Sequence, residues 1–378
     1  MRVYKFRLYP TKKQEDVLFK QLNLCRFTYN QLLEELNRDK SRKHIQHYIL
    51  DLKEKYPELK QVYSKTLQYE CYRLFSNIKG LSLSKNKGNK VGRLRFKGRD
   101  WFKTICYNQS GFNIIQQDKR YNLLHLSKIG GIKLLQHREI EGKLKGIIIK
   151  RKADSWEAHL ITDGKYKIGK GARIIGIDLG VMSFLTDNEG NKIKSPMPLK
   201  QSLAKLRILQ QSLSRKKRSS NNRQKAKLQV AKLFEHITQQ RDDFLHKTTT
   251  KLVNDCKFIG TENLNIKQLH NISWNARNMN DCAWGKFLQM LDFKAGSAGC
   301  QVVKVNPKDT TKECSACGNK QDMPLWIRQY ECPECSMSLD RDTNSAIIIL
   351  NRALEQGSAE KDNCLSVKHE ALTSTSQC

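Results

Sequence analysis

Four cysteines near the C-terminal end of the chain form two CxxC pairs, Cys314 with Cys317 and Cys332 with Cys335, with fourteen residues between the pairs. A CxxC turn places two thiolates along one edge of a tetrahedron, and two such turns facing each other complete a Cys₄ zinc site. A closed site of this kind leaves no position for a substrate. We therefore expect one structural zinc ion that holds a small ribbon over residues 313–335. A redox-active dithiol is the alternative for either pair.

Three acidic residues follow patterns that place a carboxylate at the end of a regular element. Asp178 ends the apolar strand 174–177, and Glu262 ends the strand that contains Phe258. Asp342 opens the last helix, just past the second cysteine pair. Taken singly, each acid has a structural explanation, because acids at strand ends often form turns and Asp is a good helix N-cap.

The order of these three acids along the chain suggests a shared role. A strand followed by the hairpin 181–195, a later strand with Glu262 and a final helix with Asp342 is the layout of RNase H-like domains. In that layout the carboxylates converge at one end of a mixed sheet and bind two magnesium ions, which prefer oxygen ligands. One ion generates the attacking hydroxide and the other stabilises the leaving 3′ oxygen in phosphodiester hydrolysis. Asp340 competes with Asp342 as the third ligand.

The charge balance predicts a polyanionic partner. The chain has 378 residues, with 69 Lys and Arg against 37 Asp and Glu, and its formal net charge is +32. Such an excess repels itself unless a polyanion covers it, and nucleic acid is the expected one. A generic basic surface is the alternative, and a membrane surface is disfavoured because no long apolar run occurs. Since the opening MRVYKFRLYP lacks the apolar core of a signal peptide, we expect a cytoplasmic, nucleoid-associated, prokaryotic protein.

The first half of the chain predicts two interleaved domains within an α+β multidomain protein. Residues 1–10 alternate like a strand, and residues 11–80 have helical spacing after a plausible N-cap at Thr11. Residues 81–168 hold short alternating runs broken by glycine, typical of an antiparallel β-domain. Pairing of the first strand with these runs would make the helical bundle, a recognition domain, an insertion in a β-barrel-like wedge domain.

The second half predicts an α/β domain interrupted by the ribbon. Residues 169–312 and 336–356 supply its strands and helices, with long helical runs over residues 198–254. The chain after about Gly357 is polar and patternless, so we expect residues 357–378 to be a disordered tail.

Basic and aromatic residues in two regions are candidates for nucleic-acid contacts. The first group lies in the N-terminal part, where the alternative for each aromatic is a place in the core. The second group separates the two helical runs, where the alternative is a solvated loop. The candidates are Tyr4, Arg7, Tyr9, Arg26, Tyr29, Arg93, Arg95, Phe96, Lys97, Arg215, Lys216, Lys217 and Arg218.

Taken together, these motifs resemble the TnpB family of transposon-encoded, RNA-guided nucleases, which are compact relatives of type V CRISPR effectors. RLYPTKKQ and CRFTYNQLL look like the family's N-terminal helical region, and GRLRFKGR is similar to its basic strand before the wedge-like domain. IIGIDLGV, TENLNI and DRDTNSA match its three RuvC segments, and KECSACG and CPEC match its zinc ribbon. AWGKFLQMLDFKAGSAG looks like the helix that follows the second segment.

The resemblance implies an RNA-guided DNA endonuclease with Asp178, Glu262 and Asp342 as catalytic magnesium ligands. Asp342 is preferred to Asp340 because the family motif places its acid two residues before Asn. The partners would be a structured guide RNA from the transposon end and a double-stranded target DNA, whose short adjacent motif the protein reads while base pairing reads the rest. A type V CRISPR effector, a guided DNA-binding protein that does not cut and a strand-transferring transposase are the alternatives.

Overall fold

The computed structural model describes residues 1–117, 120–164, 169, 171–266, 268, 276–324 and 326–373, with the backbone alone at residue 100 and residues 358–373. The chain divides into two compact units, Met1–Lys165 and Tyr166–Cys378. Each unit has its own sheet and its own hydrophobic core. Within the described part of the chain, no helix combines the length and apolar character needed to cross a membrane.

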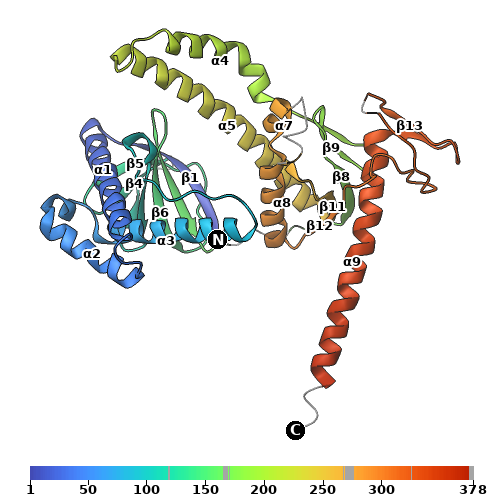
Figure 1. Ribbon diagram of the computed structural model, residues 1–378, viewed down its shortest axis with the longest axis horizontal. Helices are drawn as coiled ribbons and strands as arrows, with labels where there is room; N and C mark the ends of the chain where they lie inside the picture. Colours follow the sequence, from blue (N-terminus) through green and yellow to red (C-terminus); the bar gives the residue numbers. More distant parts are fainter. Residues whose placement is uncertain are drawn as a thin grey trace. The chain divides into compact units, whose positions relative to one another are not determined.

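A seven-stranded antiparallel sheet forms the centre of the first unit (Figure 1). Its strand order is β2-β6-β7-β1-β5-β4-β3. The first strand, β1 (Arg2–Tyr9), pairs with β7 (Trp156–Thr162) on one side and β5 (Gly130–Leu135) on the other. The remaining strands are β2 (Thr104–Asn108), β3 (Phe112–Gln116), β4 (Tyr121–Leu126) and β6 (Leu144–Arg151). The segment between β1 and β2 is therefore an insertion into this sheet.

That insertion is helical and shares one core with the sheet. It contains α1 (Lys12–Glu35), α2 (Arg42–Lys55) and α3 (Ser64–Asn86), with short 3₁₀ turns η1 (Pro57–Gln61) and η2 (Arg99–Trp101). Thr11 caps α1 as predicted. Its hydroxyl accepts from the Gln14 amide at 3.3 Å, and the Gln14 side chain accepts from the Thr11 amide at 3.0 Å. The cap starts the helix whose apolar face packs on the buried side chains of β1.

The basic segment after α3 differs from the strand expected at GRLRFKGR. The helix continues to Asn86, and residues 89–98 form neither helix nor strand. The Lys97 amide donates to the Asn30 side chain at 2.8 Å, and Asn30 and Arg26 donate back to the Lys97 carbonyl. Side chains of α1 thus take the place of a partner strand at the backbone of Lys97.

A five-stranded mixed sheet forms the centre of the second unit, with the order β10-β9-β8-β11-β12. The strands β8 (Arg173–Asp178), β11 (Cys256–Glu262) and β12 (Gln301–Val305) are parallel, and β9 (Ser183–Asp187) and β10 (Lys192–Lys194) form an antiparallel hairpin on β8. The Asp187 carboxylate accepts from the amides of Glu189 and Asn191 and so closes the hairpin turn. A separate two-stranded sheet pairs β13 (Gln329–Glu331) with β14 (Ser338–Asp340).

Two long helices of the second unit form an antiparallel hairpin fixed at its base by Asp281. These are α4 (Pro198–Ser214) and α5 (Asn221–Asp255), followed after β11 by α7 (Ala276–Cys282) and α8 (Trp284–Ala298). The buried Asp281 carboxylate accepts from the amides of Leu199 and Lys200 and from the Arg241 guanidinium. One acid thus caps α4 and pairs with α5.

The last helix, α9 (Arg341–Thr373), packs on the sheet at two glycines. Gly176 of β8 and Gly260 of β11 are direct neighbours in the parallel register. A Cβ at Gly176 would lie 2.1 Å from the carbonyl oxygen of Ala346, and one at Gly260 would lie 2.7 Å from the Cβ of Ala353. Because glycine lacks that atom, the helix can lie directly on the two strands.

The backbone of α9 is helical to Thr373. The disordered tail expected over residues 357–378 stays a prediction. Residues 374–378 lie outside the described residues.

We predict that Gly176→Ala lowers the free energy of unfolding by about 1–3 kcal/mol, because the added methyl group overpacks the contact with α9. The measurement is urea unfolding followed by circular dichroism. The matched control is Gly296→Ala in α8, where an added Cβ meets nothing within 4 Å and a better helix former is expected to be neutral or stabilising. Equal stability of the two variants would contradict the close packing of α9.

Candidate active site and metal centre

The fold brings the three acids of the second unit to one end of its sheet. Asp178 is the last residue of β8 and Glu262 is the last residue of β11, as predicted. The two strands are parallel neighbours with Thr261 opposite Ile177, so both carboxylates leave the same edge. Asp342 lies in the first turn of α9, which packs on both strands.

The electrostatics of Asp178 show that the three carboxylates lie near one another. Burial raises the pKa of Asp178 to about 8, with further contributions in the same direction from the charges of Glu262 and Asp342 and an opposing one from Arg341. Burial also raises the pKa of Glu262, against a hydrogen bond from Thr310 and the charge of Arg352. A site that resists holding three negative charges is one that a cation would stabilise.

Asp340 and Asp342 have different partners, which separates their roles. One carboxylate oxygen of Asp340 accepts from the Thr343 amide at 3.2 Å, and the other pairs with Lys192 at 2.7 Å. Asp340 is therefore the residue that caps α9. Asp342 lies 3.3 Å from the Arg341 guanidinium and 3.9 Å from that of Arg328. The sequence also allowed Asp342 to cap this helix, but Asp340 forms the cap instead.

The four cysteines form a compact cluster that fits one metal ion. The sulfurs of Cys314 and Cys335 are 3.7 Å apart, those of Cys317 and Cys332 are 3.5 Å apart, and all four lie within 4.8 Å of one another. A tetrahedral zinc ion with Zn–S bonds of about 2.3 Å separates its sulfurs by about 3.8 Å. Backbone N–H groups, first that of Cys335, lower the pKa of Cys332 to about 6 and so favour the thiolate that binds metal.

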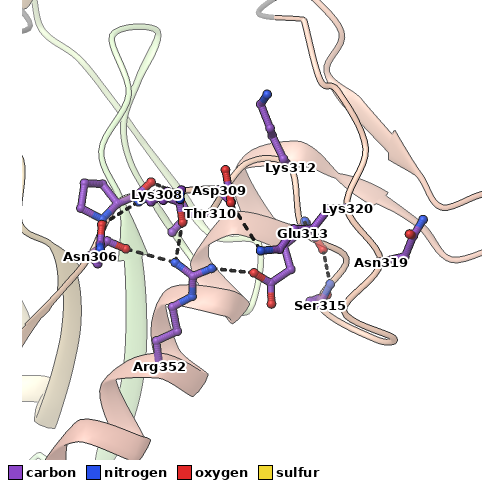
Figure 2. Close-up of polar contacts among 12 residues, drawn as sticks. Asn306, Lys308, Asp309, Thr310, Lys312, Glu313, Ser315, Asn319, Lys320 and Arg352 are labelled. Atoms are coloured by element: carbon purple, nitrogen blue, oxygen red, sulfur yellow. Dashed lines mark hydrogen bonds and ion pairs between the residues drawn. The ribbon is translucent and has the colours of Figure 1, made fainter.

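Hydrogen bonds attach the segment that leads into the cysteine cluster to α9, and they involve residues that the sequence did not single out. Arg352 of α9 binds the Glu313 carboxylate at 2.6 Å (Figure 2). Asn344 accepts from the Ser315 amide at 2.9 Å and donates to the Glu313 carbonyl at 2.7 Å. The Thr310 hydroxyl donates to Glu262 at 2.5 Å. In the sequence, the segment NPKDTTKEC indicated only that polar residues precede the first CxxC pair, and it did not predict these contacts.

The structure corrects two of the nucleic-acid candidates in the first unit. Tyr4 and Tyr29 are buried in the core, where their hydroxyls accept from the Glu141 amide and from the Asn77 side chain. Arg26 and Lys97 are half-buried at the α1 contact already described. The exposed candidates are Arg7, Tyr9, Arg93, Arg95 and Phe96.

The basic candidates of the second unit lie at the tip of the α4–α5 hairpin. The Arg223 guanidinium donates to the carbonyls of Leu213 at 2.8 Å and Lys216 at 3.1 Å and so orders the turn. The four side chains of the turn are exposed: Arg215, Lys216, Lys217 and Arg218. The helical hairpin thus presents a concentrated positive charge to solvent.

Comparison with known proteins finds related sequences over most of the chain. Three family models match separate parts of the chain: a helix-turn-helix domain at residues 1–43, a probable transposase at residues 167–273 and a Cas12f1-like TNB domain at residues 284–349. A Streptomyces pristinaespiralis protein named "Putative RNA-guided DNA endonuclease" is 27% identical over 367 residues, which are 93% of this chain and 89% of that protein. A TnpB-like protein of Acanthamoeba polyphaga mimivirus is 30% identical over 206 residues, 50% of this chain and 39% of the viral protein. The chain is thus similar to proteins named as TnpB-like and as putative RNA-guided DNA endonucleases.

A similar fold is also found in a chain of a larger assembly. A cryo-EM structure of a Cas12f1–sgRNA–target DNA complex contains a chain that matches with a TM-score of 0.60 and 17% identity, over 90% of this chain and 83% of that one. The likeness shows a Cas12f-like fold with mixed α and β content.

We predict that replacing Cys314 and Cys317 together by Ser removes one zinc ion per chain and lowers the melting temperature of the second unit, since a small ribbon cannot bury a core without its metal. Metal analysis by mass spectrometry and a thermal melt are the measurements. Cys106→Ser, in the first unit, is the control that should keep its zinc. Zinc retained by the double variant would exclude the cysteine cluster as its site.

The raised pKa of Asp178 predicts a pH dependence of stability in magnesium-free buffer. Between the unfolded pKa of 3.8 and the folded pKa of about 8, the folded state binds more protons than the unfolded state, so stability falls as pH rises through this window. Asp178→Asn should remove this loss of stability at high pH. The variant should be more stable than wild type at pH 8 by at least about 1 kcal/mol, since one pKa unit corresponds to about 1.4 kcal/mol.

The measurement is the melting temperature between pH 5 and pH 8. Asp16→Asn, at an exposed acid of α1, is the matched control. Parallel curves for wild type and Asp178→Asn would contradict the raised pKa.

Proposed function

We propose that this chain is an RNA-guided DNA endonuclease whose RuvC-type site hydrolyses phosphodiester bonds at Asp178, Glu262 and Asp342. The observation that carries the proposal is the convergence of the three acids from two parallel strand ends and one helix start. The pKa of Asp178, which is raised by burial and further by the charges of Glu262 and Asp342, supports it. The relative named as an RNA-guided DNA endonuclease, matched over 93% of the chain, supports the guided activity.

The chain's own residues prepare this site for divalent cations. Asp178, Glu262 and Asp342 would hold two Mg²⁺ ions, which when bound supply a nucleophilic hydroxide and stabilise the leaving 3′ oxygen. Zinc at the four cysteines would be structural.

The partners we propose are a guide RNA and a double-stranded target DNA. A net charge of +32 suits a protein that binds phosphate backbones, while base pairing between guide RNA and target DNA recognises the sequence. The exposed basic groups at residues 93–95 and 215–218 are the contacts we favour. In addition, we infer that the protein itself reads a short motif beside the target.

A strand-transferring transposase is the second candidate, because the family model at residues 167–273 is described as a probable transposase. The reaction products distinguish the two activities. Joined strands would indicate transfer, and free ends would indicate hydrolysis. A guided DNA-binding protein without cleavage is disfavoured because all three acids are present in the converging arrangement.

We predict that Asp178→Ala and Asp342→Ala each abolish Mg²⁺-dependent cleavage of a plasmid target while leaving RNA binding near normal, because each removes a metal ligand and no basic contact. The protein is purified with the RNA expressed beside its gene, cleavage is followed on gels, and RNA binding is measured by filter retention. Asp340→Ser is the matched control, since Ser preserves the helix cap and removes only a carboxylate that pairs with Lys192. Cutting at the wild-type rate by Asp178→Ala would refute the assignment, and loss of cutting in Asp340→Ser alone would move the third ligand to Asp340.

A further inference from the structure

The linker between β12 and the cysteine cluster, residues 306–313, contacts Glu262 directly. The Thr310 hydroxyl lies 2.5 Å from Oε1 of Glu262, and the two side chains are buried, with 2% and 8% exposure. That distance is typical of a charge-assisted O–H···O⁻ bond, which is stronger than a neutral one. Within the described part of the chain, the other oxygen of Glu262 accepts no hydrogen bond. Thr310 therefore fixes one oxygen of the carboxylate and leaves the other available.

A tight turn and one arginine hold Thr310 in place (Figure 2). Asp309 has φ of 63°, a left-handed conformation uncommon for a residue with a side chain, and its carbonyl accepts from the amides of Lys312 and Glu313 at 3.0 Å each. The Arg352 guanidinium donates to the carbonyls of Asn306 at 3.1 Å and Lys308 at 2.7 Å and to the carboxylate of Glu313 at 2.6 Å. The Arg352 side chain of α9 thus binds the linker on both sides of Thr310.

The far end of the linker continues into the cysteine cluster. Glu313 precedes Cys314, and Ser315 lies inside the first CxxC turn. Asn344, fully buried in the first turns of α9, binds the Glu313 carbonyl and the Ser315 amide with its two side-chain atoms. A continuous set of hydrogen bonds therefore joins the first cysteine turn, the linker, Thr310 and Glu262.

We propose that Thr310 is a positioning residue for Glu262, and that the four-cysteine site, acting through this linker, sets how tightly the three carboxylates bind a divalent cation. The inference rests on the proposed function, because it takes Glu262 as a cation ligand. A ribbon that loses its metal unfolds locally, which frees Glu313 and Ser315 from the Asn344 side chain. Thr310 then loses part of its support, and Glu262 must be ordered again when a cation binds, at a cost in conformational entropy.

The first test measures Mn²⁺ binding to the full chain without nucleic acid, using the electron paramagnetic resonance signal of free Mn²⁺. Thr310→Val, which keeps the shape and removes the hydroxyl, should weaken binding about 10- to 100-fold, the usual effect of losing a partner of a metal ligand. Thr310→Ser should restore it. The control Thr238→Val alters an exposed threonine of α5 whose hydroxyl bonds to the Phe234 carbonyl, and it should bind like wild type.

Glu262→Gln separates the failure of this inference from the failure of the proposed function. Weak binding by Glu262→Gln with normal binding by Thr310→Val would overturn the positioning role and leave the ligand assignment intact. Normal binding by both variants would overturn the ligand assignment and the inference with it.

The second test asks whether the cysteine site acts through Thr310. Replacing Cys317 and Cys335 together by Ser should weaken Mn²⁺ binding several-fold in the wild-type background and less in the Thr310→Val background, because coupled changes are not additive. If the double cysteine replacement weakened Mn²⁺ binding by the same factor in both backgrounds, the coupling would be overturned. Arg352→Met leaves every cysteine in place and should weaken binding in the same direction, so normal Mn²⁺ binding by this variant would also overturn the proposal.

Discussion

The close approach of α9 to the strands β8 and β11 is the contact on which the site of the second unit depends. Two acids leave the sheet at strand ends and the third comes from the helix, so their separation is set by how near the helix lies. Gly176 and Gly260 on the sheet face Ala346 and Ala353 on the helix, and small residues on both sides permit backbone contact. The same contact brings the N-terminus of α9, with its partial positive charge, to the strand ends where Asp178 and Glu262 lie.

The charge of the site is opposite to the charge of the chain. A protein with a net charge of +32 attracts a phosphate backbone from a distance, whereas three converging carboxylates repel a phosphate at close range. Under the proposed function, divalent cations would resolve this conflict by neutralising the acids and presenting positive charge to the substrate. The net charge of the chain would then act at long range, and the bound cations would act at short range.

The sequence predicted the elements that depend on local pattern. Asp178 and Glu262 end strands as expected, the hairpin between residues 181 and 195 is present, and the two CxxC pairs meet in one cluster. Local pattern and motif spacing suffice for these features, because each is decided within a few residues or by a metal geometry with few solutions.

The features that the sequence missed depend on contacts between distant segments. Tyr4 alternates with basic residues and so resembled a ligand-facing aromatic, but the insertion of helices covers its face of the sheet. The segment GRLRFKGR, expected to be a strand, instead has the backbone of Lys97 bonded to side chains of α1. The roles of Thr310 and Arg352 rest on partners about 40 residues or more away, Glu262 and the linker, which no local signal identifies.

The position of β1 in the middle of the first sheet has a consequence for folding during synthesis. This strand is made before its partners: the helical insertion and three strands separate it from β5, and the insertion and five strands separate it from β7. The helices α1 to α3 can form early from local contacts, whereas the sheet on which they pack is complete only after β7 has left the ribosome. Until β5 emerges, β1 has no partner strand and Tyr4, Phe6 and Leu8 are uncovered, so we expect chaperones that bind short apolar segments to bind there.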